Sequence, residues 1–95
     1  MDRKLEYINK DRGGYVVYKD GEGELKLFFE YGAGNCVAFI YVPKVEEWPY
    51  KTSRTIAERN AILVFVAEQA IKDQAPGCYY VLSDAYIQIF TKEIP

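Results

Sequence analysis

Regular spacing of apolar side chains divides the chain into six expected strands and one expected helix. The alternation is clearest over 24–31, where apolar residues occupy every second position and charged residues fill most of the others. The other expected strands lie at 4–9, 15–19, 36–42, 78–82 and 86–90. Glycine-containing turns are expected at 11–14, 20–23 and 32–35. Such short connections favour a meander in which neighbouring strands run antiparallel.

A single long helix is expected between the fourth and fifth strands. Thr55 and Glu58 have the spacing of a capping box, in which each side chain bonds a backbone N–H at the helix start. The helix should end near Gln74, because the Ala-Pro-Gly sequence that follows cannot continue it. The segment 43–53 is expected to be a loop. The order ββββαββ predicts an α+β fold, with a curled, mostly antiparallel sheet packed around one long central helix.

This helix is apolar over an unusually wide arc, because the seven residues 61–67 are all apolar. At about 100° per residue, its apolar positions span an arc of about 200°, which a curled sheet could cover. Phe65 lies about 200° from Leu63 and beside Gln69, on the face expected to meet solvent. The sequence therefore predicts that Phe65 has no partner within its own chain.

Apolar side chains are also expected on the outer face of the sheet. Phe28 alternates with charged residues. The strand at 36–42 is apolar on both faces, and its second face carries Val37, Phe39 and Tyr41 although one helix can cover only one face. We therefore expect a homodimer with two-fold symmetry. The residues expected at its interface are Phe28, Ile62, Phe65 and Gln69. A different protein partner, or a sheet that covers Phe65 after all, are the alternatives.

The chain contains no histidine, which removes the commonest general base and metal ligand, and every Ser-His or Cys-His nucleophile. Its two cysteines, Cys36 and Cys78, are expected to be buried free thiols and cannot complete a zinc site. We therefore expect no metal and no cofactor, and lean toward a protein that is not an enzyme.

Basic residues gather around the expected helix start, where backbone N–H groups and the helix dipole favour an anion. They are Lys51, Arg54 and Arg59. They form a candidate anion-binding site, with salt bridges to Glu46, Glu47 or Glu58 as the alternative.

Two aromatic residues, Trp48 and Tyr50, precede this basic group on a segment bracketed by prolines. Together they form a candidate aromatic wall for a ligand, with a lid over the end of the core as the alternative.

The 95 residues are expected to form one domain, since a chain of this size supports one core. Twelve basic and fourteen acidic residues give a net charge of −2 without a basic tract, which disfavours nucleic acid and membrane surfaces as partners. The absence of an apolar leader and of a membrane-length apolar run favours the cytoplasm.

No motif assigns the chain to a family. The expected function is that of a small cytosolic interaction module acting as a homodimer. Its size and element order occur among small bacterial accessory proteins, including products of mobile gene cassettes and immunity proteins. The alternative is a small-molecule-binding protein or minor enzyme, with an aromatic pocket and a basic anion-holding group at the helix start.

Overall fold

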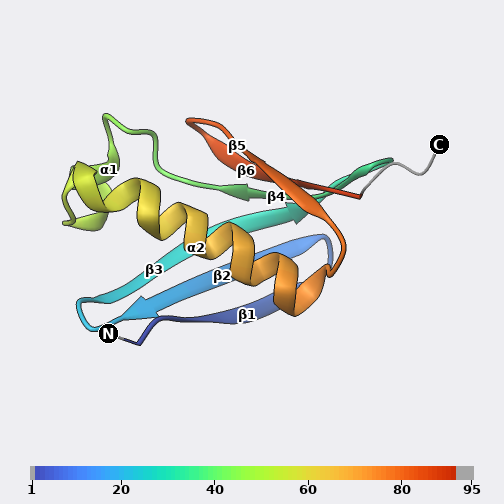
Figure 1. Cartoon of the computed structure of the whole chain (residues 1–95), viewed down its shortest axis with the longest axis horizontal. Helices are drawn as coiled ribbons and strands as arrows, with labels where there is room; N and C mark the ends of the chain where they lie inside the picture. The colour runs from blue at the N-terminus through green and yellow to red at the C-terminus, as the bar shows by residue number, and fades with distance from the viewer. Residues whose placement is uncertain (1, 92–95) are drawn as a thin grey trace.

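The computed structural model describes residues 2–91 as a six-stranded antiparallel sheet with one long helix packed on it (Figure 1). The strands are β1 (Lys4–Lys10), β2 (Gly13–Asp20), β3 (Gly23–Tyr31), β4 (Cys36–Tyr41), β5 (Tyr79–Leu82) and β6 (Tyr86–Phe90). The helices are α1 (Trp48–Thr52) and α2 (Ile56–Gln74). The α+β class and the predicted sequence of six strands and one long helix along the chain are confirmed. The short helix α1 was not predicted.

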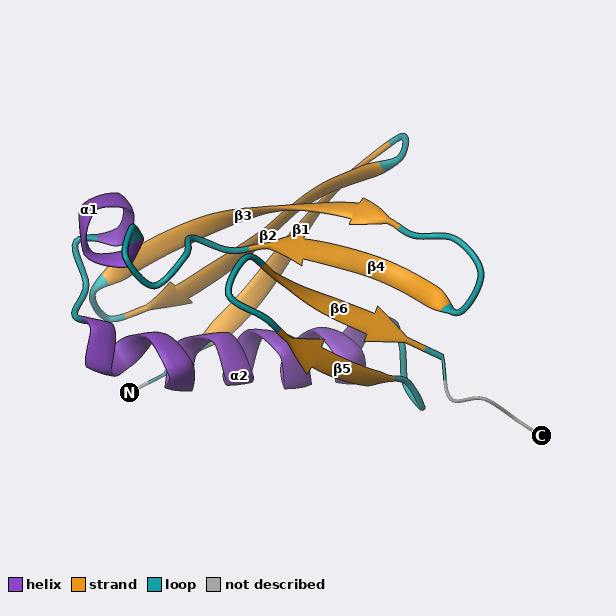
Figure 2. Cartoon of the chain, turned by 90° about the horizontal axis from the view of Figure 1, so that it is seen from above, coloured by secondary structure: helices purple, strands orange, loops and turns teal. Residues whose placement is uncertain are grey.

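The strands are arranged in the order β1-β2-β3-β4-β6-β5. The first four form the expected meander, and the final hairpin returns to pair β6 with the free side of β4. Helix α2 lies across one face, and β1 and β5 both curl far enough to contact it (Figure 2). The sheet is therefore curled but open, with β1 and β5 as its edges.

Segment 43–53, expected as a loop, contains the short helix α1. Pro49 stands in its first turn, where a missing N–H costs nothing, and Ser53 ends it with a φ of 58°. A helix of five residues is too short to show an apolar period, which is why the pattern did not predict it.

Two glycines expected in the first turn, Gly13 and Gly14, instead begin β2 and are buried. Gly14 has a φ of 152°, and a Cβ atom there would overlap the carbonyl oxygen of Ile8 on β1. A Cβ on Gly13 would similarly overlap the Phe29 carbonyl on β3. These glycines therefore permit close approach of three strands as well as a change of direction.

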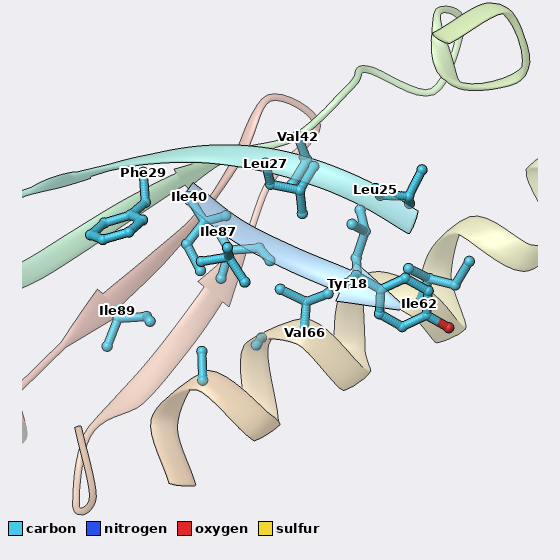
Figure 3. Packing of buried hydrophobic residues seen from close by; sticks show 14 of the residues in the cluster. Tyr18, Leu25, Leu27, Phe29, Ile40, Val42, Ile62, Val66, Ile87 and Ile89 are labelled. Atoms are coloured by element: carbon cyan, nitrogen blue, oxygen red, sulfur yellow. The ribbon is translucent and has the colours of Figure 1, made fainter. Parts of the chain in front are cut away.

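The core lies between α2 and the concave face of the sheet (Figure 3). Strand residues at alternate positions point toward the helix, as in Leu25, Leu27 and Phe29 of β3. The helix contributes Leu63 and Val66, both fully buried. The wide apolar arc is thus covered by a sheet that curls around it, as predicted.

The prediction that Phe65 has no partner within the chain is wrong. Its ring packs edge-on against Tyr18, 5.8 Å between centroids, and the Arg3 guanidinium lies 5.5 Å from its centroid. The curl of the sheet and the residues preceding β1 reach around the helix to this side. Ile62, also expected at an interface, is 2% exposed and belongs to the core.

The start of α2 has the expected capping box of Thr55 and Glu58. The backbone N–H of Thr55 donates to Glu58 Oε1 at 3.1 Å, while the Thr55 hydroxyl donates to the same oxygen at 3.0 Å. The carboxylate of Glu58 therefore holds the segment that enters the helix. At the other end, α2 stops at Gln74, as predicted.

Candidate functional site

Arg54, predicted to hold an anion, is bound by a carboxylate of its own chain. Its two terminal nitrogens donate to Asp20 Oδ2 at 2.8 Å and Oδ1 at 3.0 Å, and both side chains are almost fully buried. Asp20 also accepts bonds from the Tyr18 hydroxyl and the Glu22 backbone N–H, each at 2.8 Å. This pair joins the end of β2 to the start of α2.

The Arg54 guanidinium holds the pKa of Asp20 well below its usual value of 3.8. Burial opposes this shift, while the bonds from Glu22 and Tyr18 support it. The sequence favoured Glu46, Glu47 or Glu58 as partners for the basic group. Of these, Glu58 lies 4.0 Å from Arg54, and the main partner comes from a distant strand that local spacing could not indicate.

Arg59 and Trp48 also have partners within the chain. The Arg59 guanidinium donates to the Pro43 carbonyl at 3.0 Å and to the Asp84 carbonyl at 2.9 Å. Trp48 is fully buried, and its Nε1–H donates to the Thr55 carbonyl at 2.9 Å. Both side chains therefore fasten the α1 region to the rest of the fold.

Lys51 and Tyr50 lie on the outside of α1. The Lys51 ammonium pairs with Glu47 at 3.4 Å, and Tyr50 is 88% exposed. The structure therefore separates Tyr50 from buried Trp48, and the two rings do not form a common wall.

A groove of about 680 Å³ lies beside the start of α2. None of the five predicted ligand residues lines it. Its charged lining residues are Asp2, Arg3, Asp20, Glu22 and Glu58. A lining with more carboxylates than cations disfavours a bound anion, so the geometry does not support the predicted anion site.

The strongest surface feature is instead the convex face of the sheet, which no element of the described chain covers (Figure 2). Aromatic rings cross it from strand to strand. Phe28 lies 5.7 Å from Tyr15 and 5.8 Å from Tyr41, and Tyr86 continues the row 6.2 Å from Tyr41. Phe39 packs 5.6 Å from Tyr86. We call these five residues the aromatic row.

The aromatic row follows from strand alternation. On β3, Leu27 and Phe29 face the helix, so Phe28 between them faces outward. On β6, Ile87 and Ile89 are buried, so Tyr86 faces outward. A second stacked pair, Tyr79 and Phe90, extends the apolar surface to the β5 edge. The uncovered face is therefore aromatic across five neighbouring strands.

Charged residues border the aromatic row on the side of β1. Lys19 pairs with Glu6 at 2.8 Å and with Glu24 at 3.5 Å, and Lys26 lies over the Tyr15 ring. The Tyr41 hydroxyl donates to Glu30 at 2.6 Å, which raises the pKa of Tyr41. Both signs of charge are thus present, and Lys19 is paired with glutamates, so the face has no strongly basic character.

The sequence placed Phe28, Phe39 and Tyr41 on an uncovered face but did not identify Tyr15 and Tyr86 as part of it. Phe28 is 43% exposed and Tyr41 is 40% exposed. Period-two alternation also marks Tyr15, Tyr41 and Tyr86 as outward-facing, but it does not show which strands are neighbours. The pairing of β6 with β4 makes the separate rings contiguous.

Gln69, the last predicted interface residue, is half buried on α2 and donates to Asp73 at 2.8 Å. Cys36 and Cys78 are free thiols, as predicted, but they are half buried rather than fully buried. Within residues 2–91, no cluster of three Cys, Asp or Glu side chains has the arrangement of a metal site.

Neither helix of the described chain has the length and apolar character needed to cross a bilayer. No protein-family model matches the chain, and no curated protein or solved structure matches it.

Proposed function

We propose that the protein is a non-enzymatic, cytoplasmic interaction module that acts as a homodimer through the convex face of its sheet. The observation that carries this proposal is the aromatic row, whose rings contact one another across four strands and are not covered by any other element of residues 2–91. Exposed aromatic clusters of this extent on a folded domain are typical of protein interfaces.

The charges around the aromatic row support a second copy of the same chain as the partner. A nucleic acid requires a basic surface, whereas here lysines and glutamates alternate and pair, as Lys19 does with Glu6 and Glu24. In a two-fold dimer each face meets an identical face, so a neutral surface carrying both signs can pair with itself. Two such sheets pack face to face about 10 Å apart, with aromatic side chains interdigitating.

This interface differs from the one suggested by the helix pattern. Ile62 and Phe65 are engaged within the chain, so α2 contributes less to association than its sequence indicates. Of the four interface residues expected from the sequence, Phe28 lies on the convex face. The other residues of the aromatic row complete the proposed interface.

The test is solution mass by light scattering over a wide concentration series, for wild type and Phe28→Glu. The exposed 43% of Phe28, for an aromatic side chain of about 200 Å², corresponds to roughly 2 kcal/mol of apolar burial per copy. Two copies per dimer give about 4 kcal/mol, so the substitution should raise the dimer Kd about a thousandfold.

Ile56→Glu is the matched control, because Ile56 is an apolar residue of α2 with 51% exposure. It should leave the dimer intact, and circular dichroism should show that both variants remain folded. A wild type that stays monomeric at millimolar concentration would overturn the proposal. Dissociation by Ile56→Glu but not by Phe28→Glu would also overturn it, and would move the interface to the helix.

A further inference from the structure

An apolar pocket of about 220 Å³ lies between the sheet and the C-terminal end of α2. This is the end of the helix away from α1 and the Arg54–Asp20 pair (Figure 1). Its floor contains Phe29, Ile40 and Ile89, which project from the sheet toward the helix in Figure 3. The pocket is therefore a continuation of the core that side chains have not filled.

Small side chains account for this space. Ala38 on β4, Ala70 on α2 and Ala75 just after it line the walls, where larger apolar residues would close the gap. A bulge between Cys36 and Ala38 also shifts the register of β4 against β6. Protein interiors are normally close-packed, and an apolar cavity of about 150 Å³ is enough to bind benzene. The space here is larger and opens to solvent at a polar rim, while its inner walls are mostly apolar.

The mouth of the pocket is polar but uncharged. Asn9 and Tyr31 lie on one side and Gln74 on the other, and all three are exposed at the rim. The Tyr31 hydroxyl makes a long bond of 3.4 Å to Asn9 Oδ1. Among residues 2–91, no residue accepts a hydrogen bond from the Asn9 amide nitrogen. The Asn9 side-chain amide can therefore donate a hydrogen bond to a ligand at the rim without losing a strong hydrogen bond within the chain.

Tyr7 completes the wall of the pocket without adding a charged group to it. Its hydroxyl donates to Asp73 Oδ2 at 2.8 Å, and Gln69 donates to the other oxygen of the same carboxylate. Burial, and then the bond to Asp73, raise the pKa of Tyr7 above the usual phenol value, which itself lies above neutral pH. Among residues 2–91, no Lys, Arg, Asp or Glu lines the pocket, so a charged ligand would lose its hydration without gaining a counter-ion from these residues.

We propose that this pocket binds a small uncharged aromatic molecule of one or two fused rings that carries one hydrogen-bonding group. The rings occupy the alanine-lined space above Phe29 and Ile89, and the polar group meets the Asn9 amide at the mouth. The pocket opens on the concave side of the sheet, so the proposal does not depend on association through the convex face.

The experiment is an NMR titration of the full ¹⁵N-labelled chain with phenol, indole and benzamide, with benzoate as the charged counterpart of benzamide. The neutral probes should shift amides near Asn9, Ala38 and Ala70 and leave those around Trp48 unchanged. Benzoate should bind at least tenfold more weakly than benzamide. Absence of saturable shifts at millimolar neutral probe, or equal binding of benzoate, would overturn the proposal.

Two variants test the location. Ala70→Leu fills the pocket from α2 and should weaken all neutral probes at least tenfold, whereas Ala57→Leu makes the same change at an exposed position of the same helix and should not. Asn9→Ala changes an exposed rim residue without entering the core. It should weaken benzamide about threefold to tenfold and leave toluene unaffected. Unchanged binding in a folded Ala70→Leu or in Asn9→Ala would contradict the assignment.

Discussion

Replacement of Arg54 by methionine should destabilise the protein by about 3 to 5 kcal/mol. The substitution removes both bonds from the guanidinium to Asp20 and leaves that carboxylate buried with its bonds from Tyr18 and Glu22. A hydrogen bond to a charged group contributes about 1.5 to 3 kcal/mol, so the loss of two gives a similar figure of about 3 to 6 kcal/mol. A domain of this length has a total stability of roughly 5 to 14 kcal/mol, so the effect is large.

Urea unfolding measures this change through two signals, far-ultraviolet circular dichroism and the fluorescence of Trp48. Lys51→Met is the control, because it also removes a cation near the start of α2, but from an exposed pair with Glu47. Its unfolding midpoint should stay close to that of wild type. The double variant Arg54→Met with Asp20→Asn should cost less than the sum of the single changes, because neither charge is then left unpaired.

The same measurement separates a structural role of Arg54 from ligand binding. If Arg54 held an external anion, its replacement would cost little stability, and inorganic phosphate would stabilise wild type in proportion to its binding. A loss below about 1 kcal/mol for Arg54→Met, combined with stabilisation by phosphate, would refute the structural role.

Two further effects on stability follow from the fold. The pKa of Asp20 is lowered in the folded state, so the pair stabilises the protein fully above pH 3.8 and loses its effect as the pH falls below that value. The stability difference between wild type and Asp20→Asn, measured in urea, should therefore shrink below pH 3.8, and a constant difference would contradict this. Gly14→Ala should cost more than about 2 kcal/mol, because the new methyl group overlaps the Ile8 carbonyl. Gly23→Ala has a φ of 129° but open space, so it should cost only about 1 kcal/mol, and equal losses would argue against the overlap.

The elements of the fold were predictable because their patterns are local. Alternation over β3 and the stop signal after Gln74 each depend on residues close in sequence. The sheet order was not predictable in the same way, since both sides of the meander could accept the final hairpin. When β6 pairs with β4, Ile87 and Ile89 are buried in the core. This packing joins residues that are distant in sequence, so a short stretch of sequence does not predict it.

At the candidate site, too, contacts between residues distant in sequence were not predictable. The sequence placed Arg54 in a basic group that would bind either an anion or a neighbouring glutamate, but its partner is Asp20, separated by 34 positions. Phe65 was misplaced because an angular plot of one helix assumes that solvent begins where the apolar arc ends. Here Tyr18 and Arg3 extend past that boundary and cover the ring.

Strand β3 connects the two proposals physically while keeping them separable. Phe28 points outward into the aromatic row, and Phe29, the next residue, points inward to the floor of the pocket. Association therefore uses one side of the strand and ligand binding uses the other, with no side chain shared between them. Coupling between the two would require movement of the β3 backbone itself, which is bonded to β2 along its length and to β4 at the pocket end. Such a backbone resists displacement, so dimer formation and ligand binding should act as independent equilibria.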